Sequence, residues 1–381
     1  MLFSAVTNCM TPIPSTVARE GMSRPLGVAG TRVAGVGLCG AHRARSPPRS
    51  SCAVFAQVVE PSSSALPLET DKRGRERLAY RPEGYSTWQW QHVTANGASH
   101  NVNYVAAGDS GPIVVLIHGF GASAYHWRYV IPELSKKARV YALDCLGFGL
   151  SDKALVDYEG YGIWKEQIKE FIEQVVHKGT PSGEKVVLVG NSLGGYNSMA
   201  VAAAYPELVD KVVLLNAAGR FDPNASMEDV EKNGVENESV FAKIGKAIKR
   251  AVVGATFIWT KQPYRVQQVL RSVYVSHDTI DEELVDSILK PADDPRASEV
   301  FFRVITSRGT PVNLLLDEMA KADIPVFLLW GEGDPWCVPA NADRIEKYYK
   351  NSKKVFIDAG HCPHDDDGSV VVKELMAYLD I

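Results

Sequence analysis

The strongest constraint on the fold is a series of short, continuous apolar runs separated by segments that read as helices. A strand buried on both faces of a sheet appears in a sequence as such a run. Residues 161–178, between two of the runs, have apolar residues at helical spacing. Strands that alternate with helices predict a parallel sheet covered by helices on both faces. The runs are PIVVLIHG (112–119), ARVYALD (138–144), KVVLVG (185–190), KVVLLN (211–216), IPVFLLWG (324–331) and KKVFIDAG (353–360).

Two further features complete the predicted architecture. The alternating segments TWQWQHV (87–93) and NVNYVAAG (101–108) predict an antiparallel hairpin that extends one edge of the sheet. Between residues 219 and 310 the alternation stops, and the segment reads as mostly helical. We therefore expect an α/β fold with a mostly parallel eight-stranded sheet, helices on both faces, and a helical cap inserted over the carboxyl ends of the strands.

The composition of residues 1–56 differs from that of the rest of the chain. These residues include six arginines, no lysine and one acidic residue, and they are rich in Ser, Thr, Ala, Gly and Val. This composition predicts an organelle transit peptide. The chloroplast is favoured over the mitochondrion, because Ser and Pro break the segment and no amphipathic arginine helix is evident. A disordered tail is the alternative interpretation.

The predicted domain boundaries follow from these patterns. Residues 1–56 are expected to be a chloroplast transit peptide. Residues 57–84 are charged and contain Pro and Ser, which predicts a flexible linker. Residues 85–218 and 311–381 are expected to form the two parts of the α/β body, and residues 219–310 the helical cap.

Charge, hydropathy and cysteine usage exclude several functional classes. The net charge of −4 over 381 residues gives no electrostatic basis for binding nucleic acid. No stretch approaches the ~18 consecutive apolar residues of a membrane-spanning helix. After residue 56, Cys145, Cys337 and Cys362 match neither a disulfide framework nor a metal-binding spacing. A redox switch between Cys337 and Cys362 stays open, although a buried structural thiol is the commoner role.

The stretch VLVGNSLGGY (187–196) places one serine between glycines, where a buried strand meets an alanine-rich helix. A nucleophile elbow has this arrangement, because a strained turn lifts the serine hydroxyl above the sheet and the glycines let strand and helix approach each other. A helix-capping serine or a phosphate-binding loop would also suit a glycine-rich turn. Neither phosphate-binding pattern, GxGxxG or GxxxxGK[ST], occurs at this turn. We therefore interpret Ser192 as a nucleophile.

A serine nucleophile needs a histidine base and an acid that orients the base, in the chain order Ser, acid, His. His361 follows a predicted strand and lies at its carboxyl end, where ligands collect in open α/β sheets. The other candidate bases are His364, three residues further along the chain, and His277 in the cap segment. The predicted acid is Asp334 in LLWGEGDPWCVP, with Glu332 as the alternative. We expect Asp334 to fix the imidazole tautomer while it stays ionised.

The tetrahedral intermediate of acyl transfer needs two backbone N–H donors. Leu193, which follows the nucleophile, is expected to supply one, and Phe120 in HGFGAS the other. His118 in that loop is expected to be structural rather than a base. No cofactor and no metal are required by this chemistry. The candidate substrate-binding residues, placed near the oxyanion and acid loops, are His126, Trp127 and Trp336.

Several motifs together resemble the α/β-hydrolase superfamily over about residues 85–381. The motifs are HGFGAS, LDCLGFGLSDK, VGNSLGGY, GEGDPWCVP and AGHCPHD. The longer stretch HGFGASAYHWRYVIPELSKKARVYALDCLGFGLSDKALVDY resembles the chloroplast serine hydrolases of plants and algae, a group that includes pheophytinase and chlorophyll dephytylase. The resemblance implies that Ser192 is the nucleophile, Asp334 the acid and His361 the base, with Phe120 and Leu193 as oxyanion donors.

The resemblance indicates the mechanism better than the substrate. Pheophytinase and chlorophyll dephytylase cut the phytol ester of chlorophyll pigments, but lipases, lactonases, C–C hydrolases and cofactor-free haloperoxidases share the pattern. Epoxide hydrolases and haloalkane dehalogenases carry aspartate at the nucleophile position, so Ser192 argues against both. We expect a plastid serine hydrolase that cleaves a hydrophobic carboxylic ester, of the phytyl or lipid type, through an acyl-enzyme. A C–C bond hydrolase, an acylglycerol lipase and a low-turnover ligand-binding protein are the alternatives.

Residues 240–259 of the cap segment admit two interpretations. Phe241, Ile244, Ile248 and Val252 recur at helical spacing, with basic residues between them. A basic amphipathic helix of this kind can lie on an anionic membrane surface, here through peripheral contact with a thylakoid or envelope membrane. In the other interpretation, which we favour, the apolar face packs on the body and the lysines are solvated. The oligomeric state does not follow from the sequence.

Overall fold

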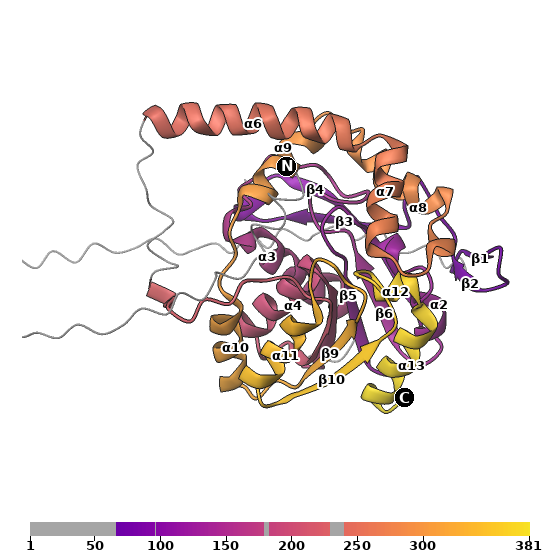
Figure 1. The fold of residues 1–381 in the computed structure, drawn as a ribbon. Helices are drawn as coiled ribbons and strands as arrows, with labels where there is room; N and C mark the ends of the chain where they lie inside the picture. The colour runs from indigo at the N-terminus through magenta and orange to yellow at the C-terminus, as the bar shows by residue number, and fades with distance from the viewer. Residues whose placement is uncertain (1–65, 96, 179–182, 229–239) are drawn as a thin grey trace, which may run out of the picture. The chain divides into compact units, whose positions relative to one another are not determined.

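A computed structural model describes residues 66–95, 97–178, 183–228 and 240–381, which belong to one compact unit. The strands of its main sheet are β3 (Ser86–Gln91), β4 (Ser99–Ala107), β5 (Ile113–Ile117), β6 (Arg139–Leu143), β7 (Val186–Asn191), β8 (Val209–Leu215), β9 (Val326–Gly331) and β10 (Ser352–Ile357). Their spatial order is β10-β9-β8-β7-β5-β6-β4-β3 (Figure 1). The pairs from β10 to β6 are parallel, whereas β4 pairs antiparallel with both β6 and β3. The predicted mostly parallel, eight-stranded sheet with a hairpin at its edge is confirmed.

The sheet separates two hydrophobic cores, because successive side chains of a strand point to opposite faces. The helices that cover the faces are α2 (Ile131–Leu134), α3 (Gly162–Phe171), α4 (Leu193–Ala204), α10 (Val312–Lys321), α11 (Pro339–Tyr348) and α13 (Gly368–Leu379). In β5, Ile113, Val115 and Ile117 lie in one core, and Val114 and Leu116 lie in the other. The first core continues into α3, α4, α10 and α11, and the second into α2 and α13. Burial on both faces explains why the strands are continuous apolar runs.

Two of the helical segments between the strands are interrupted. The segment around residues 125–135 consists of a 3-10 turn, η2 (Ala124–Trp127), followed by the short α2. Pro132 lies in the first turn of α2, where its missing N–H is tolerated, but a helix that ran through it would lose a hydrogen bond. The segment 161–178 consists of α3 and a π-helical turn, η4 (Ile172–Val176). Neither interruption changes the order of the elements.

The described part of the segment expected as a linker, residues 66–84, is folded against the body. It contains a small antiparallel hairpin of β1 (Leu68–Thr70) and β2 (Glu76–Leu78). Leu78 is fully buried, and its N–H donates to the carbonyl of Arg128 (2.9 Å). The Arg77 side chain forms an ion pair with Asp281 of the cap segment. These residues are therefore not a flexible linker. The predicted transit peptide (1–56) and residues 57–65 lie outside the described residues.

The described residues between β8 and α10 are mostly helical, and they lie over the carboxyl ends of the strands. The elements are α6 (Val240–Thr260), α7 (Pro263–Val273), η5 (His277–Thr279), α8 (Glu282–Ala292) and α9 (Ala297–Thr306). Figure 1 shows α6 crossing over α9. The carbonyl of Val273 accepts from the N–H of His361 (2.7 Å), beyond β10, and the ring of Phe301 packs on Phe120, beyond β5. None of the described helices combines the length and the apolar character needed to cross a membrane.

Candidate active site

Ser192 lies in the sharp turn between β7 and α4, with backbone angles φ 52° and ψ −117°. A serine rarely adopts a positive φ, so the surrounding structure has to hold it there. The Ser192 N–H donates to the carbonyl of Leu215 (3.0 Å), and the Ala218 N–H donates to the carbonyl of Ser192 (2.9 Å). A Cβ atom on Gly194 would lie 2.1 Å from the Ile117 carbonyl oxygen, so this position requires glycine. The turn has the geometry of a nucleophile elbow.

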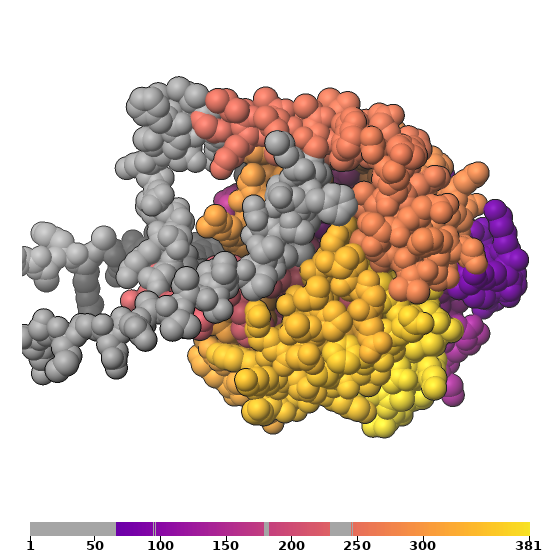
Figure 2. All heavy atoms as spheres, in the orientation of Figure 1, coloured from indigo at the N-terminus to yellow at the C-terminus, as the bar shows by residue number. Residues whose placement is uncertain are grey.

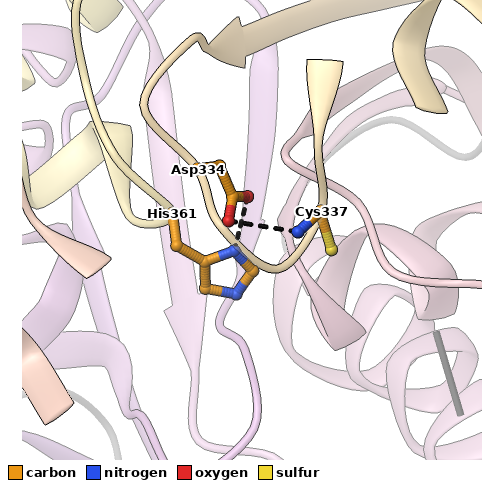
Figure 3. A group of neighbouring side chains, drawn as sticks. All are labelled: Asp334, Cys337 and His361. Carbon is orange, nitrogen blue, oxygen red and sulfur yellow. Dashed lines mark hydrogen bonds and ion pairs between the residues drawn. The ribbon is translucent and has the colours of Figure 1, made fainter. Parts of the chain in front are cut away.

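Asp334 and His361 come from the loops after β9 and β10, and their side chains point toward each other (Figure 3). His361 Nδ1 lies 2.7 Å from Asp334 Oδ2, and both residues are buried. Asp334 Oδ1 also accepts from the backbone N–H groups of Trp336 (2.7 Å) and Cys337 (3.1 Å). Burial alone would raise the pKa of Asp334, but His361 and these donors lower it below its ordinary value. Asp334 is therefore an ionised acceptor that can hold the proton of His361 on Nδ1.

Two asparagines at strand ends position this pair of loops. Asn216 Nδ2 donates to Asp334 Oδ2 (2.7 Å), and Asn216 Oδ1 accepts from the Gly331 N–H (2.9 Å). Asn191 Nδ2 donates to the carbonyl of His361 (2.8 Å), which ties the histidine loop to the residue before Ser192. Neither role is predicted from the sequence. The available signal was an asparagine at the carboxyl end of each of two buried strands.

Asp366 holds the histidine loop from the other side. Its carboxylate accepts from the Gly360 N–H (2.7 Å) and from the N–H groups of Val275 (2.8 Å) and Ser276 (2.7 Å), just beyond α7. The loop that carries His361 is thus fixed both to the body and to the cap. This role was also missed in the sequence, where Asp366 reads only as one of three consecutive aspartates.

The two predicted oxyanion donors belong to the residue after Ser192 and to the loop after β5. Gly119 packs against Ser192, because a Cβ atom on Gly119 would lie 3.2 Å from Ser192 Cβ, and Phe120 follows it in the chain. Within the described part of the chain, the N–H groups of Phe120 and Leu193 donate to no backbone or side-chain acceptor. Two unpaired N–H groups beside a candidate nucleophile are what an oxyanion hole requires.

No hydrogen bond joins Ser192 Oγ to His361 Nε2 among the described residues. Such bonds are often long without substrate and shorten in the Michaelis complex. The Trp336 ring packs edge-on against the His361 ring, with 4.9 Å between the ring centroids. Of the three candidate substrate-binding residues, Trp336 therefore lies at the histidine.

The other buried histidines have different surroundings. His118 Nδ1 contacts the Gly119 carbonyl (2.7 Å), and its Nε2 accepts from the Cys145 N–H (2.9 Å), so the ring fixes the loop after β5 as a neutral tautomer. His364 stacks on Trp127, with centroids 4.1 Å apart, and no described hydrogen bond joins its ring to a carboxylate. His361 is thus the histidine paired with an acid after Ser192. 

His126 and Trp127, the remaining candidate substrate-binding residues, are buried. His126 Nδ1 accepts from the Ser123 N–H (3.3 Å), and Trp127, the last residue of η2, lies in the second core. No described hydrogen bond or ring contact joins either side chain to Ser192, Asp334 or His361. Their contact with a substrate stays a prediction.

Asp334, Cys337 and His361 also form the one group among the described residues whose ligand atoms could surround a metal ion, all within 4.8 Å of one another (Figure 3). A metal there would have to displace the proton of His361 Nδ1 from its bond to Asp334. It would also need the thiolate of Cys337, whose pKa burial raises well above its ordinary value. The residues fit the acid and base of a triad better than a metal site.

Comparison with known proteins places this arrangement in a family context. The model of the α/β-hydrolase fold family matches residues 112–368. The chain is 28% identical over 305 residues to the chloroplastic pheophytinase of Arabidopsis thaliana, a match that covers 70% of this chain and 60% of that protein. Over 147 residues it is 38% identical to the 2-hydroxy-6-oxo-6-(2'-aminophenyl)hexa-2,4-dienoic acid hydrolase of Metapseudomonas resinovorans, covering 38% of this chain and 47% of that protein. The chain thus spans less than two thirds of either relative.

Solved structures show the same fold. A membrane phospholipase A, described as a bacterial virulence factor, superposes with a TM-score of 0.59 at 24% identity. The superposition covers 78% of this chain and 86% of that one. At this identity the likeness concerns the fold alone.

Proposed function

The chain belongs to the α/β-hydrolase family, and on that premise we propose that it is a serine hydrolase that cleaves a hydrophobic carboxylic ester. The observation that carries the proposal is that three loops meet at the carboxyl ends of β7, β9 and β10 of one sheet. Ser192 occupies a strained turn after β7, and the Asp334–His361 pair follows β9 and β10. The Asn191–His361 hydrogen bond joins the histidine loop to the elbow.

Acylation begins when Ser192 Oγ attacks the ester carbonyl carbon and His361 Nε2 takes the hydroxyl proton. Asp334 holds the other imidazole proton on Nδ1 and stabilises the imidazolium without taking that proton. The N–H groups of Phe120 and Leu193 bind the carbonyl oxygen as it becomes negative, and each such donor supplies about 3 kcal/mol of transition-state stabilisation.

Collapse of the tetrahedral intermediate breaks the bond to the alcohol oxygen, and His361 returns the proton to the leaving alcohol. The acyl group remains on Ser192. A water molecule then attacks the acyl carbonyl with His361 as base, and the carboxylic acid and free serine are released. Every proton is carried by His361, so the chain's own residues supply the whole cycle.

The aromatic side chains around the oxyanion loop support a hydrophobic substrate. The Phe120 ring packs on Phe148 (5.4 Å between centroids) and on Phe301 of α9 (5.2 Å). The space beside these rings is too small to hold a water molecule, and it is lined by His118, Gly119, Cys145, Phe148, Trp164, Leu193 and Asn197. The aromatic rings themselves, rather than an open pocket, favour an apolar acyl or alcohol chain over a charged one. The phytyl or lipid type of ester is the finer part of the proposal.

A plastid location is part of the same proposal. The arginine-rich, lysine-free composition of residues 1–56 and the chloroplastic name of the Arabidopsis relative support it. Residues 1–56 fused to a fluorescent protein are expected to direct it into chloroplasts. A fusion that stays in the cytosol or enters mitochondria would contradict this part.

The function is tested with the full chain and its Ser192→Ala variant on p-nitrophenyl octanoate and on chlorophyll a. We expect the wild type to hydrolyse the octanoate and the variant to lose at least about ten-thousandfold in turnover. Release of phytol or of fatty acid then identifies the substrate class. If the folded wild type turns over no ester, the low-turnover ligand-binding function replaces this one.

C–C bond hydrolysis is the second candidate, because the identity to the dienoic acid hydrolase reaches 38%. The same Ser192 and His361 would serve it. Cleavage of a 2-hydroxy-6-oxo-dienoic acid at a rate above that of the octanoate would favour this function over ester hydrolysis.

A further inference from the structure

The outer face of α6 is apolar and exposed. Four of its large side chains, Ile248, Val252, Ile258 and Trp259, are between 55% and 61% exposed. Figure 2 shows α6 at the rim of the molecule, with no described segment lying over it. Exposed apolar side chains that form one continuous stripe mark an interaction surface. We call the stripe the α6 outer face, and it consists of Ile248, Ala251, Val252, Ala255, Ile258 and Trp259.

The opposite side of the same helix packs on the body. The Phe257 ring contacts Phe301 of α9 (5.2 Å between centroids), and the Arg250 guanidinium lies over the Phe302 ring and pairs with Glu299. The helix is therefore apolar on two sides, and burial against α9 uses only one of them. The favoured expectation, that the apolar face containing Ile248 and Val252 packs on the body while the lysines are solvated, is wrong for Ile248 and Val252, which are exposed.

The charge around the α6 outer face has one sign. Residues 240–273, which span α6 and α7, contain seven Lys and Arg residues and no Asp or Glu, in a chain whose net charge is −4. Arg250 and Lys261 pair with acids from α9 and the loop before it. Within the described residues, Lys249, Arg265 and Arg271 have no acidic partner. These cations are left to attract an external anion.

Aromatic residues mark the end of the surface at the turn from α6 to α7. The Arg265 guanidinium lies 4.0 Å from the Trp259 ring centroid and also covers the Tyr264 ring (5.2 Å). Gln268 bridges Arg265 and the Tyr264 hydroxyl. Tyr264 is 60% exposed. Trp, Tyr and Arg together, each with an apolar body and a polar or charged end, suit the boundary between lipid tails and headgroups.

We propose that the α6 outer face and the α6–α7 turn dock onto the surface of a membrane that contains anionic lipid. The apolar stripe enters the headgroup–acyl boundary, and the unpaired basic side chains bind the lipid phosphates. A second copy of the chain is the poorer occupant, because a two-fold contact would press this basic surface against itself. The surface is independent of the chemistry at Ser192.

Docking there would bind the membrane to a helix pair that contacts the histidine loop of the candidate active site. Val273, at the end of α7, accepts the hydrogen bond from His361 N–H, and Asp366 binds the residues just beyond α7. The helix pair that carries the surface is thus attached to the histidine loop.

Vesicle flotation of the full chain tests the proposal, with phosphatidylcholine alone or with an equal amount of anionic phosphatidylglycerol. The wild type is expected to float with the anionic vesicles. The variant Val252→Ser/Trp259→Ser should lose binding to both vesicle types. The variant Lys249→Glu/Arg271→Glu should lose the preference for phosphatidylglycerol, by roughly fivefold for each basic residue removed.

Matched controls change exposed residues elsewhere. Two control variants, Val93→Ser/Leu68→Ser and Lys72→Glu/Lys137→Glu, should float as the wild type does. All variants keep the basic residues 1–56, so any lipid binding by that segment is the same in each of them. Hydrolysis of a soluble ester should be the same in all variants, which separates failure of docking from failure of the proposed function. Absence of flotation by the wild type, or equal flotation by the surface variants, would overturn the proposal. So would a wild-type dimer that the surface variants make monomeric without any vesicle binding.

Discussion

At the scale of single residues, Ser192 is held in a backbone conformation that costs about 1–3 kcal/mol. Its bonds to Leu215 and Ala218 and the close approach of Gly194 to β5 hold it there. In return, the hydroxyl is fixed at the N-terminus of α4, beside two N–H groups that have no described acceptor. The strain is therefore associated with function rather than with folding, and the chemistry depends on a small number of exact contacts.

Replacement of Asp334 by asparagine tests the acid. The amide can no longer accept the Nδ1 proton as a carboxylate does, so the imidazole loses its required tautomer. We expect kcat to fall about ten-thousandfold while the fold is retained. Glu332→Gln is the matched control, because Glu332 is exposed in the same loop, and it should change kcat by less than about twofold. Equal losses in the two variants would contradict the role of Asp334.

Buried histidines make stability depend on pH. Burial, with the neighbouring His118 and Arg128, lowers the pKa of His126 to about 3, and burial lowers that of His364 well below its ordinary value. These rings are neutral when folded but bind a proton when unfolded below about pH 6.5. The free energy of unfolding is therefore highest above that pH and falls as the pH drops through it, by up to about 1.4 kcal/mol per pH unit for each ring.

His364→Phe isolates one of these rings. Phenylalanine keeps the stacking on Trp127 and removes a buried Nδ1 that has no hydrogen-bond partner. Urea unfolding from pH 7.5 to 5 should show a slope for the variant that is smaller by up to about 1.4 kcal/mol per pH unit. Parallel pH profiles for wild type and variant would show that His364 is not kept neutral by the fold.

At the scale of elements, the elbow depends on how closely α4 approaches β7 and β5. Gly194→Ala would place a methyl group against the Ile117 carbonyl, so we expect a loss of about 1–3 kcal/mol in unfolding free energy and a loss of ester hydrolysis. Gly254→Ala in α6 is the matched control, because its Cβ would meet nothing within 4 Å, and it should stabilise the protein by about 0.5–1 kcal/mol. Similar effects of the two substitutions would contradict the packing described for the elbow.

The sheet could be predicted from sequence because its strands are buried on both faces and read as uninterrupted apolar runs. The fold of residues 66–84 could not be predicted in this way, because Arg77 is paired with Asp281, which lies more than 200 positions further along the chain. Likewise, apolar spacing in α6 does not reveal which of two apolar sides meets the body. Motifs in the sequence predicted Ser192, Asp334 and His361. No motif indicates the role of Asn216, which is a hydrogen bond to Asp334 in a distant loop.

At the scale of the whole molecule, a buried cluster of charges joins the cap to the body. Arg128 is fully buried, and it binds Asp365 beside the histidine loop and Asp281 at the start of α8. Burial alone would lower the pKa of the Arg128 guanidinium, but the carboxylates of Asp365 and Asp281 raise it well above its ordinary value. Arg77 of the β1–β2 hairpin also pairs with Asp281. Cap, hairpin and histidine loop are therefore coupled at one point.

Arg128→Met tests that coupling. The substitution leaves Asp365 buried without its cation, so we expect a loss of about 3–5 kcal/mol in unfolding free energy, measured by urea denaturation. Arg296→Met breaks an exposed pair with Asp294 and should cost no more than about 1 kcal/mol. Equal costs would mean that the cluster does not hold the cap on the body.

The most direct test of the central claim is the mass of a covalent adduct at Ser192. The folded full chain is treated with a fluorophosphonate, digested, and analysed by mass spectrometry alongside the Ser192→Ala variant. We expect one adduct, on the peptide that contains Ser192, and no adduct on the variant. An adduct on another residue, or a folded wild-type chain that does not react, would contradict the assignment of Ser192 as the nucleophile.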